Sequence, residues 1–415
     1  MPVSEVWFIS WLTGAYGPVS AYACSGIAVI AGPTAAARPR NRKQLIVEAA
    51  GRVFSERGYH AASMEEIAAN VGITAAALYR HFPNKYTLFA ECANVMVDRL
   101  TAALDEVPAE GGLVDVLGAV SRVTVAHRAS GGVYRWEARY LDREDRRILR
   151  AKFAHVVGRV TEVAGREHAL PGAHLRAAAA LGAIGSITMH RTSIAHRRAE
   201  ELLLASALRV AATDPAANAG NARPVELPAQ PVPRTRRAEI LAAAVPLFER
   251  DGFANVTNAR IAEAVGLATS AIYRHYPSKV DILVAACLQA AGLLAQAVEQ
   301  NLRGVADPRD AVAVLAATYV AYSFEHTTLT NVAAAELAGL PADLQRPLIL
   351  AQREHIAVWE QQLRLARPDL DARQARVLVH AGFGVVVEAG RALRWEDTHD
   401  HRGAVASLVV GALGL

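Results

Sequence analysis

A run of tyrosine, arginine and histidine occurs twice in the 415-residue chain, at residues 79–81 and again at residues 273–275. In both places a proline and a lysine follow within four residues, the lysines being Lys85 and Lys279. Tyrosine and histidine side chains can hydrogen-bond phosphate oxygens, and a lysine adds a point charge beside them. A helix core needs none of these polar groups, so their repetition predicts two surfaces that contact the backbone of double-stranded DNA.

These residues belong to a longer internal repeat. Residues 40–85 align without a gap on residues 234–279, with 17 identical residues among the 46 aligned. Each copy is followed by helical sequence of about the same length, and residues 214–233 between them contain five prolines. Prolines stiffen a chain and remove hydrogen-bond donors, which predicts a semi-extended linker. The chain is therefore predicted to be one unit that was duplicated and fused.

The first copy has the pattern of a helix-turn-helix. Apolar residues recur at helical spacing through residues 46–54, which predicts an amphipathic first helix. Ser63, with Glu66 three residues later, is a capping box that opens a second short helix. After a tight turn at Gly72, Thr74 caps a third helix, which is predicted to extend to residue 82.

The second copy departs from the first at one informative place. Thr257 keeps the cap of the second helix, but Ala268 replaces the threonine that caps the third helix. Thr269 or Ser270 could substitute for that cap, yet the change makes the second copy the weaker candidate for DNA binding. The excess of basic over acidic residues is also larger in the first copy, with eight against four in residues 38–90 and seven against five in residues 234–284.

Both segments resemble the N-terminal DNA-binding domain of the TetR family of bacterial transcriptional regulators. The motif of the first copy is Phe54…Gly58-Tyr59…Ser63…Ile67-Ala68…Val71-Gly72…Leu78-Tyr79-Arg80-His81-Phe82-Pro83-Asn84-Lys85…Leu88. The second copy repeats it from Phe248 through Lys279 to Leu283. Of these residues, Phe54, Ile67, Leu78 and Phe82 are expected in the core.

The polar residues and the small face of the third helix are the candidate DNA contacts, through phosphates, base edges and thymine methyls. In the first helix-turn-helix, residues 63–82 and flanks, they are Arg40, Arg42, Lys43, Ser63, Thr74, Ala75, Ala76, Tyr79, Arg80, His81 and Lys85. In the second, residues 257–276 and flanks, they are Arg234, Arg236, Arg237, Thr257, Thr269, Ser270, Tyr273, Arg274, His275 and Lys279.

The resemblance implies an all-α fold with two tandem modules, each a three-helix DNA-binding head followed by a helical ligand-binding and dimerisation tail. The predicted divisions are a disordered or mis-annotated extension (1–37), head one (38–99), tail one (100–213), the linker (214–233), head two (234–294) and tail two (295–415). Family members are homodimers that respond to a ligand in the tail. The helices rich in small residues that are predicted over 175–194, 199–212, 372–391 and 405–415 would here pair within one chain, although a homodimer stays possible.

The expected function is that of a transcriptional regulator, a ligand-responsive repressor with a DNA operator and a small apolar effector as partners. Candidate effector-pocket residues, which could equally be surface or core, are Trp136, Arg139, Tyr140, Tyr322 and His326. The rival hypothesis is a ligand-binding or protein-interaction module in which one or both heads have lost DNA binding.

Other classes of function find little support in the sequence. With 52% hydrophobic residues the chain can bury a core, and three widely spaced cysteines predict neither a disulfide framework nor a four-thiolate zinc site, which favours a cytoplasmic protein. The acidic and histidine-containing stretch 396–401 favours a solvated loop over a metal site. Nucleotide-binding and hydrolase motifs do not occur, so neither an enzyme nor a cofactor is expected. The charge-free stretch from Val6 to Ala37 is broken by glycines and prolines, and no membrane association is expected.

Overall fold

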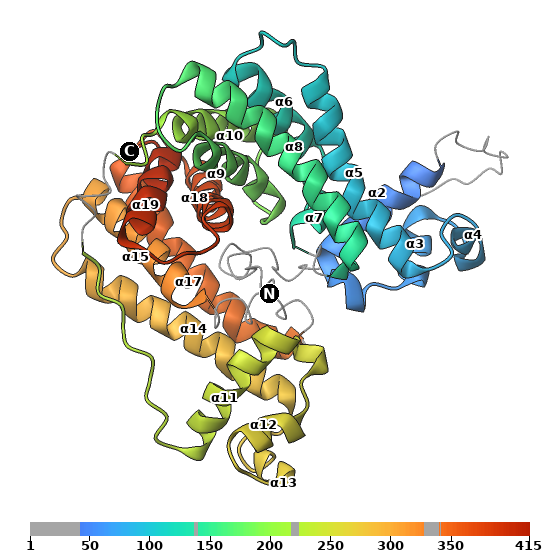
Figure 1. Cartoon of the computed structure of the whole chain (residues 1–415), viewed down its shortest axis with the longest axis vertical. Helices are drawn as coiled ribbons and strands as arrows, with labels where there is room; N and C mark the ends of the chain where they lie inside the picture. The colour runs from blue at the N-terminus through green and yellow to red at the C-terminus, as the bar shows by residue number, and fades with distance from the viewer. Residues whose placement is uncertain (1–41, 137–139, 217–223, 328–339, 341) are drawn as a thin grey trace, which may run out of the picture.

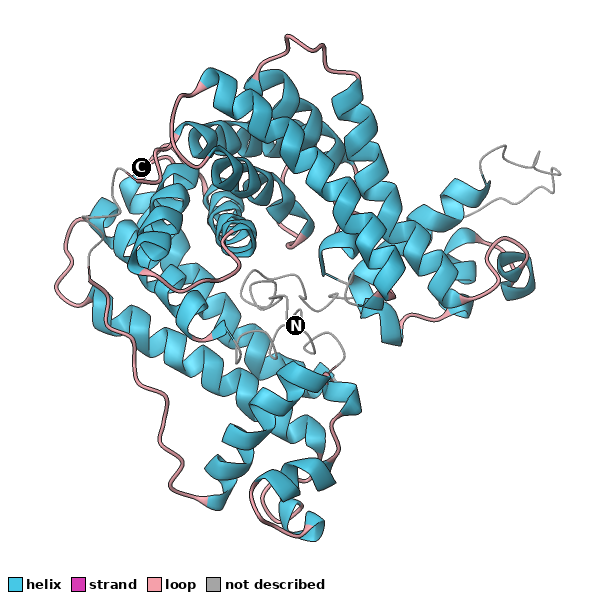
Figure 2. Ribbon diagram, viewed as in Figure 1, coloured by secondary structure: helices cyan, strands magenta, loops and turns pink. Residues whose placement is uncertain are grey.

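The computed structural model describes residues 42–136, 140–216, 224–327, 340 and 342–415, and all regular secondary structure in these ranges is helical (Figure 2). The extension at residues 1–37 lies outside the described residues. The helices form two successive modules with the same order of elements (Figure 1). This confirms the predicted all-α fold with two tandem modules.

Module one consists of a head, a long connecting helix and a helical tail. Its elements are α2 (Arg42–Ala61), α3 (Met64–Val71), α4 (Ala75–Tyr79), α5 (Lys85–Asp105), α6 (Leu113–Ala126), α7 (Val133–Trp136), α8 (Arg143–Glu167), α9 (Ala173–Gly185), η2 (Ser186–Thr188) and α10 (His196–Ala212). Module two repeats this order with α11 (Arg236–Asp251), η4 (Phe253–Asn255), α12 (Asn258–Ala264), α13 (Thr269–Ile272), α14 (Lys279–Leu302), α15 (Pro308–Glu325), α17 (Ala342–Ala366), α18 (Ala372–Ala392) and α19 (His399–Leu413).

Each head is a small apolar core closed by three helices and the start of the long helix. The core residues are fully or almost fully buried, as expected from their periodicity, and they include Phe54, Ile67, Leu78, Phe82, Phe248, Ile261 and Ile272. The division between head and tail falls inside a continuous helix in both modules, because residue 99 lies in α5 and residue 294 lies in α14. A rotation of either head must therefore turn or bend a helix that is also part of the tail core.

The two tails pack against each other within the chain. Helix α9 packs mainly against α18, and α10 contacts both α18 and α19 (Figure 1). At the crossing of α9 and α18 the backbones touch at Gly182 and Gly384, where a Cβ on either glycine would overlap the carbonyl oxygen of the other. The helix predicted over residues 175–194 is wrong in its length, since α9 ends at Gly185 and only the single turn η2 follows.

The described part of the linker lies along module two (Figure 1). Asn301, near the end of α14, accepts from the Glu226 amide at 3.0 Å and donates to the Glu226 carbonyl at 2.8 Å. Pro228 is buried. The segment is extended, as predicted, but it is bound to the helix that leaves head two.

Helix α14 is, among the described helices, the one with the length and apolar composition to cross a membrane. Half of its most apolar stretch is buried, and it packs against α11, α15 and α17. Such burial is typical of a core helix, which by itself passes the same test.

Candidate nucleic-acid interface

The turn in head one is held by local caps on both sides. The Ser63 hydroxyl accepts from the Glu66 amide at 3.0 Å, and the Thr74 hydroxyl accepts from the Ala77 amide at 3.2 Å. Between them Gly72 closes α3 with φ +72°, a left-handed conformation that glycine adopts without strain. The capping box is only half formed, because the Glu66 carboxylate accepts from Arg57 at 3.2 Å and does not return to the Ser63 amide.

Helix α4 is shorter than predicted, since it ends at Tyr79 and not at residue 82. Pro83 disfavours helical backbone at the preceding residue, and residues 80 and 81 form a turn. Leu78 and Phe82 face the core, which confirms the core assignment of the two residues. The opposite side is accessible: Thr74, Ala76, Arg80 and His81 are exposed, Ala75 is half-buried and Tyr79 is 45% exposed.

Head two presents a similar surface, but its third helix has no side-chain cap. Thr257 caps α12 by accepting from the Arg260 amide at 3.3 Å, whereas Ala268 offers no side-chain cap to the four-residue α13. Neither Thr269 nor Ser270 takes over the cap, because both lie inside the helix. The two hydroxyls are exposed, Tyr273 is 53% exposed, and Arg274 is exposed while His275 is half-buried.

The two lysines expected to contact phosphate are instead bound within their own heads. Lys85 Nζ donates to the carbonyl oxygens of Tyr59, His60 and Ala62 at 2.9, 3.2 and 3.1 Å. It also lies 4.7 Å from the centre of the Tyr59 ring, and partial burial lowers the pKa of its ammonium group. Since an ammonium has three donors, the carbonyls at the end of α2 satisfy all of them, and the expectation of a phosphate contact needs correction.

Lys279 repeats this arrangement in head two. Its Nζ donates to the carbonyl oxygens of Phe253 and Val256 at 2.5 and 2.8 Å and lies 4.3 Å from the centre of the Phe253 ring. These carbonyls follow the glycine at which the first helix is kinked in head one (Gly58) and capped in head two (Gly252). The lysine is therefore a positively charged cap that holds the turn into the helix-turn-helix. Its repetition in both copies reflects this structural role.

We expect Lys85→Met to destabilise head one by about 1.5 kcal/mol, since hydrogen bonds from a charged donor to three carbonyls are lost. The slope of DNA affinity against salt should not change, whereas loss of a phosphate contact would reduce it by about 0.9. Thermal unfolding and binding at several salt concentrations measure both effects. Arg80→Met is the matched control, because Arg80 is exposed. This substitution should lower the slope of DNA affinity against salt without lowering the stability. A reduced slope in Lys85→Met would show that Lys85 does contact phosphate in the wild-type protein.

The basic arms before each head are partly engaged as well. Lys43 pairs with Glu91 at 3.0 Å, and Arg236 pairs with Glu239 at 2.6 Å. Arg237 stacks on Tyr276 with 4.0 Å between the guanidinium carbon and the ring centre, and it donates to the His275 carbonyl. Arg237 therefore anchors the arm to the head. Of the remaining predicted arm residues, Arg42 is half-buried, Arg234 is exposed and Arg40 lies outside the described residues.

Of the predicted effector-pocket residues of tail one, the structure describes the side chain of Tyr140. The side chain of Trp136 and the whole of Arg139 lie outside the described residues. Tyr140 stacks on Tyr59 with ring centres 5.5 Å apart, and its ring lies 4.6 Å from that of His60. Tyr140 is therefore packed against the end of α2 in head one, and its role in effector binding stays a prediction.

In tail two, Tyr322 and His326 are close together and buried. The Tyr322 hydroxyl donates to the Ala290 carbonyl of α14 at 2.8 Å, and the two rings are 4.7 Å apart. His326 Nδ1 lies 3.4 Å from Nε2 of Gln230 in the linker. Both residues thus contact segments that lead to or from head two, and their role in effector binding stays a prediction.

Sequence reasoning missed a polar joint between head one and tail one. The Tyr86 hydroxyl at the start of α5 donates to Asp145 at 2.6 Å and accepts from the Asp142 amide at 2.9 Å. Burial, together with the hydrogen bond to Asp145, raises the pKa of Tyr86. These partners are more than 50 residues apart along the chain, so no local pattern could have indicated them; Val280 at the equivalent position in module two cannot form such bonds.

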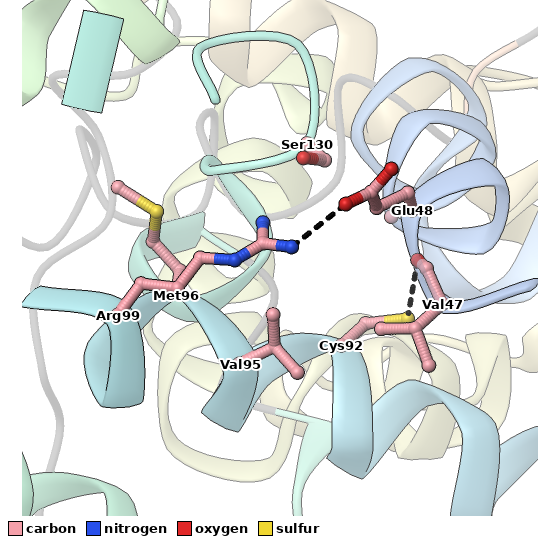
Figure 3. Close-up of a pocket in the computed structure, with 8 residues that line it drawn as sticks. Val47, Glu48, Cys92, Val95, Met96, Arg99 and Ser130 are labelled. Atoms are coloured by element: carbon pink, nitrogen blue, oxygen red, sulfur yellow. Dashed lines mark hydrogen bonds and ion pairs between the residues drawn. The ribbon is translucent and has the colours of Figure 1, made fainter. Parts of the chain in front are cut away.

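A small hollow lies between α2, α5 and the turn that follows α6 (Figure 3). Arg99 on α5 crosses it and donates to Glu48 of α2 at 2.8 Å and to Nδ1 of His127 at 3.0 Å. Because an arginine can only donate, His127 Nδ1 is an acceptor in this arrangement. The hollow has an empty volume of about 250 Å³, open solvent included, and none of the predicted effector residues lines it.

Comparisons with known proteins match the two heads. Residues 46–92 and 240–286 match the family model described as bacterial regulatory proteins, tetR family. The chain is 42% identical over 67 residues to the HTH-type transcriptional activator FasR of Mycolicibacterium smegmatis, a match that covers 16% of this chain and 30% of that protein. It is 38% identical over 76 residues to the HTH-type transcriptional repressor AcnR of Corynebacterium diphtheriae, covering 18% and 38%.

These matches span about a third of the length of the curated relatives. Among solved structures, a TetR-family transcriptional regulator from Bordetella parapertussis 12822 aligns with a TM-score of 0.39 and 24% identity, covering 44% of this chain and 95% of that chain.

Proposed function

The chain belongs to the TetR family of bacterial regulatory proteins, with two modules in tandem, and from this premise we propose that it is a DNA-binding transcriptional regulator. In this proposal it is a cytoplasmic, ligand-responsive repressor that binds one operator through both heads. The observation that carries the proposal is the pair of solvent-exposed third helices, each with a tyrosine and an arginine accessible beside a buried apolar core. Such a helix can enter the major groove while its flanking residues contact phosphates.

Gel-shift or filter-binding assays with selected DNA fragments test this proposal. Specific binding should weaken steeply as salt is raised, because phosphate contacts release counterions. The rival function, a ligand-binding or protein-interaction module without DNA binding, predicts no sequence preference at any salt concentration. Neither head needs to be deleted, because point variants in each head separate the contributions of the two heads to DNA binding.

We expect Tyr79→Phe to weaken DNA binding more than Tyr273→Phe. Removing one phosphate hydrogen bond should cost about 1 kcal/mol, or roughly fivefold in affinity, and should do so on all sequences alike. Head two contributes less because α13 has four residues and no side-chain cap. Each variant is compared with the wild type at one salt concentration, and a greater loss from Tyr273→Phe would reverse the ranking of the heads.

The proposed assembly is a pseudo-two-fold dimer within one chain. The packing of α9 and α10 against α18 and α19 supports it, because these are the helices that would otherwise join two chains. Light scattering of the protein bound to a selected operator tests the stoichiometry. One chain per operator is expected, and two chains on a perfect palindrome would contradict the proposal.

The proposed effector is a small apolar molecule that binds in a tail and shifts the head attached to it. In tail two, Tyr322 and His326 favour this route, since the hydroxyl of Tyr322 is bonded to α14. A ligand that displaced this bond would act directly on the helix leading to head two. Calorimetry with candidate ligands, on wild type and Tyr322→Phe, tests the route.

A further inference from the structure

A pair of histidines from opposite halves of the chain is stacked in the junction between the tails. His190 follows η2 in module one, and His380 lies in the middle of α18 in module two. Their ring centres are 4.1 Å apart and the ring planes differ by 11°. The exposed fractions of the two residues are 7% and 2%, so both rings are sealed from solvent by the packed tails.

The polar contacts around the pair favour neutral rings. His190 Nδ1 lies 2.7 Å from the Thr192 hydroxyl oxygen and 3.3 Å from the Thr192 amide nitrogen. His190 Nε2 and His380 Nδ1 are buried and have no partner among the described residues. Because an imidazolium carries a proton on both ring nitrogens, charging either ring would leave one of these buried N–H groups without an acceptor.

The charged groups that act on the pair are cations on both sides. Arg128, after α6, acts on His190, and Arg376, one turn before His380 on α18, acts on both rings. Arg376 is itself paired with Glu360 of α17 at 2.5 Å, so this carboxylate is already engaged. Burial first, and Arg128 and Arg376 second, lower the pKa of His190 to about 3. Burial first, then His190 and then Arg376 hold the pKa of His380 well below its ordinary value of 6.5.

We propose that the His190–His380 stack is an acid-sensitive latch between the two halves of the chain. With both rings neutral, the stack packs the end of η2 onto α18 and closes the junction. Once the junction opens, water reaches the rings and each can take up a proton, so acid favours the open arrangement. The junction cannot close again while both rings are protonated, because two stacked imidazolium ions would repel each other and the two nearby arginines.

The dependence on pH follows from the direction of the pKa shifts. Both pKa values are depressed in the closed state, so closure is fully favoured above the ordinary histidine pKa of 6.5 and weakens as the pH falls below it. Each histidine contributes up to tenfold per pH unit to the ratio of open to closed molecules. Between about pH 7.5 and about pH 5.5, the two together should raise that ratio by about 100-fold.

Hydrogen–deuterium exchange on the full chain tests the latch. After correction for the intrinsic effect of pH on exchange, we expect α9 and α18 to lose protection by up to about 100-fold over this interval, while α3 of head one serves as the internal reference. In His190→Phe/His380→Phe, which keeps two stacked rings, the additional loss in α9 and α18 should vanish. His196→Ala is the control, because His196 is exposed and should behave as the wild type.

Two results would overturn the latch. One is an equal dependence on pH in the wild type and in the double phenylalanine variant. The other comes from imidazole titration of the unmodified protein by NMR, which needs no variant to fold: we expect both rings to stay neutral down to about pH 5. Titration of either ring near its ordinary pKa in the closed protein would show that the junction does not exclude its charged form.

Discussion

Gly182→Ala is expected to destabilise the chain by at least about 2 kcal/mol, although alanine is the better helix former. The reason is the crossing of α9 and α18, where the new Cβ would overlap the Gly384 carbonyl oxygen, an atom of the backbone that cannot turn aside. The two helices must move apart, and the buried surface of the tail junction is lost with them. Gly384→Ala should have an effect of the same size, because its Cβ would overlap the Gly182 carbonyl.

Gly158→Ala is the matched control for this prediction. Gly158 lies in α8 with open space where a Cβ would be placed, so the same substitution should stabilise the helix by about 0.5–1 kcal/mol. Urea unfolding followed by circular dichroism measures all three variants. If Gly182→Ala and Gly158→Ala change the stability in the same direction, the crossing seen here is not the junction of the protein in solution.

Exchanging the tip of the third helix in head two should convert an asymmetric operator into a symmetric one. The wild type has Thr74-Ala75-Ala76 in head one and Ala268-Thr269-Ser270 in head two, so one head offers methyl groups to base edges and the other hydroxyls. The triple variant Ala268→Thr/Thr269→Ala/Ser270→Ala gives both heads the same tip. From random DNA we expect the wild type to select two unlike half-sites and the variant to select two like ones.

The affinity of the triple variant for the wild-type operator should fall by about tenfold to 100-fold, since a mismatched base pair costs about 1–3 kcal/mol. The reciprocal exchange in head one is the control. It should also select two like half-sites, but with weaker binding, because head one then loses the hydroxyl that caps α4. Selection of a perfect palindrome by the wild type would contradict the assignment of unlike half-sites.

The heads could be predicted from the sequence because the interactions that define them are local. Ser63, Thr74 and Thr257 cap helices through amides three residues away, and the apolar residues of each head follow helical spacing. Because capping is local, Ala268 also indicates from the sequence that the third helix of head two lacks a side-chain cap. Errors arose where a local rule was incomplete, as at the end of α4, where Pro83 acts on the residue before it.

The roles of the charged and aromatic residues depended on partners that are distant along the chain. The sequence favours a phosphate contact for Lys85, yet its three acceptors lie 23 to 26 residues earlier, at and just after the end of α2. From the sequence Tyr140 could equally be a pocket, surface or core residue, and in the structure it stacks on Tyr59 of the head. The residue type and its spacing in the sequence are the same whether such a side chain binds a ligand or packs within the protein. Only the position of its partner in the fold distinguishes the two roles.

The sequence by itself determined that the chain is a duplicated, all-α protein with two helix-turn-helix heads, because repeats, caps and helical periodicity are properties of neighbouring residues. Only the tertiary structure decided how the halves meet. Gly182 and Gly384 are adjacent at one helix crossing, and His190 lies on His380, although each pair is separated by roughly half the chain. The small residues of these helices favour close packing in general, but the two backbones that touch are selected by the packing of both complete tails.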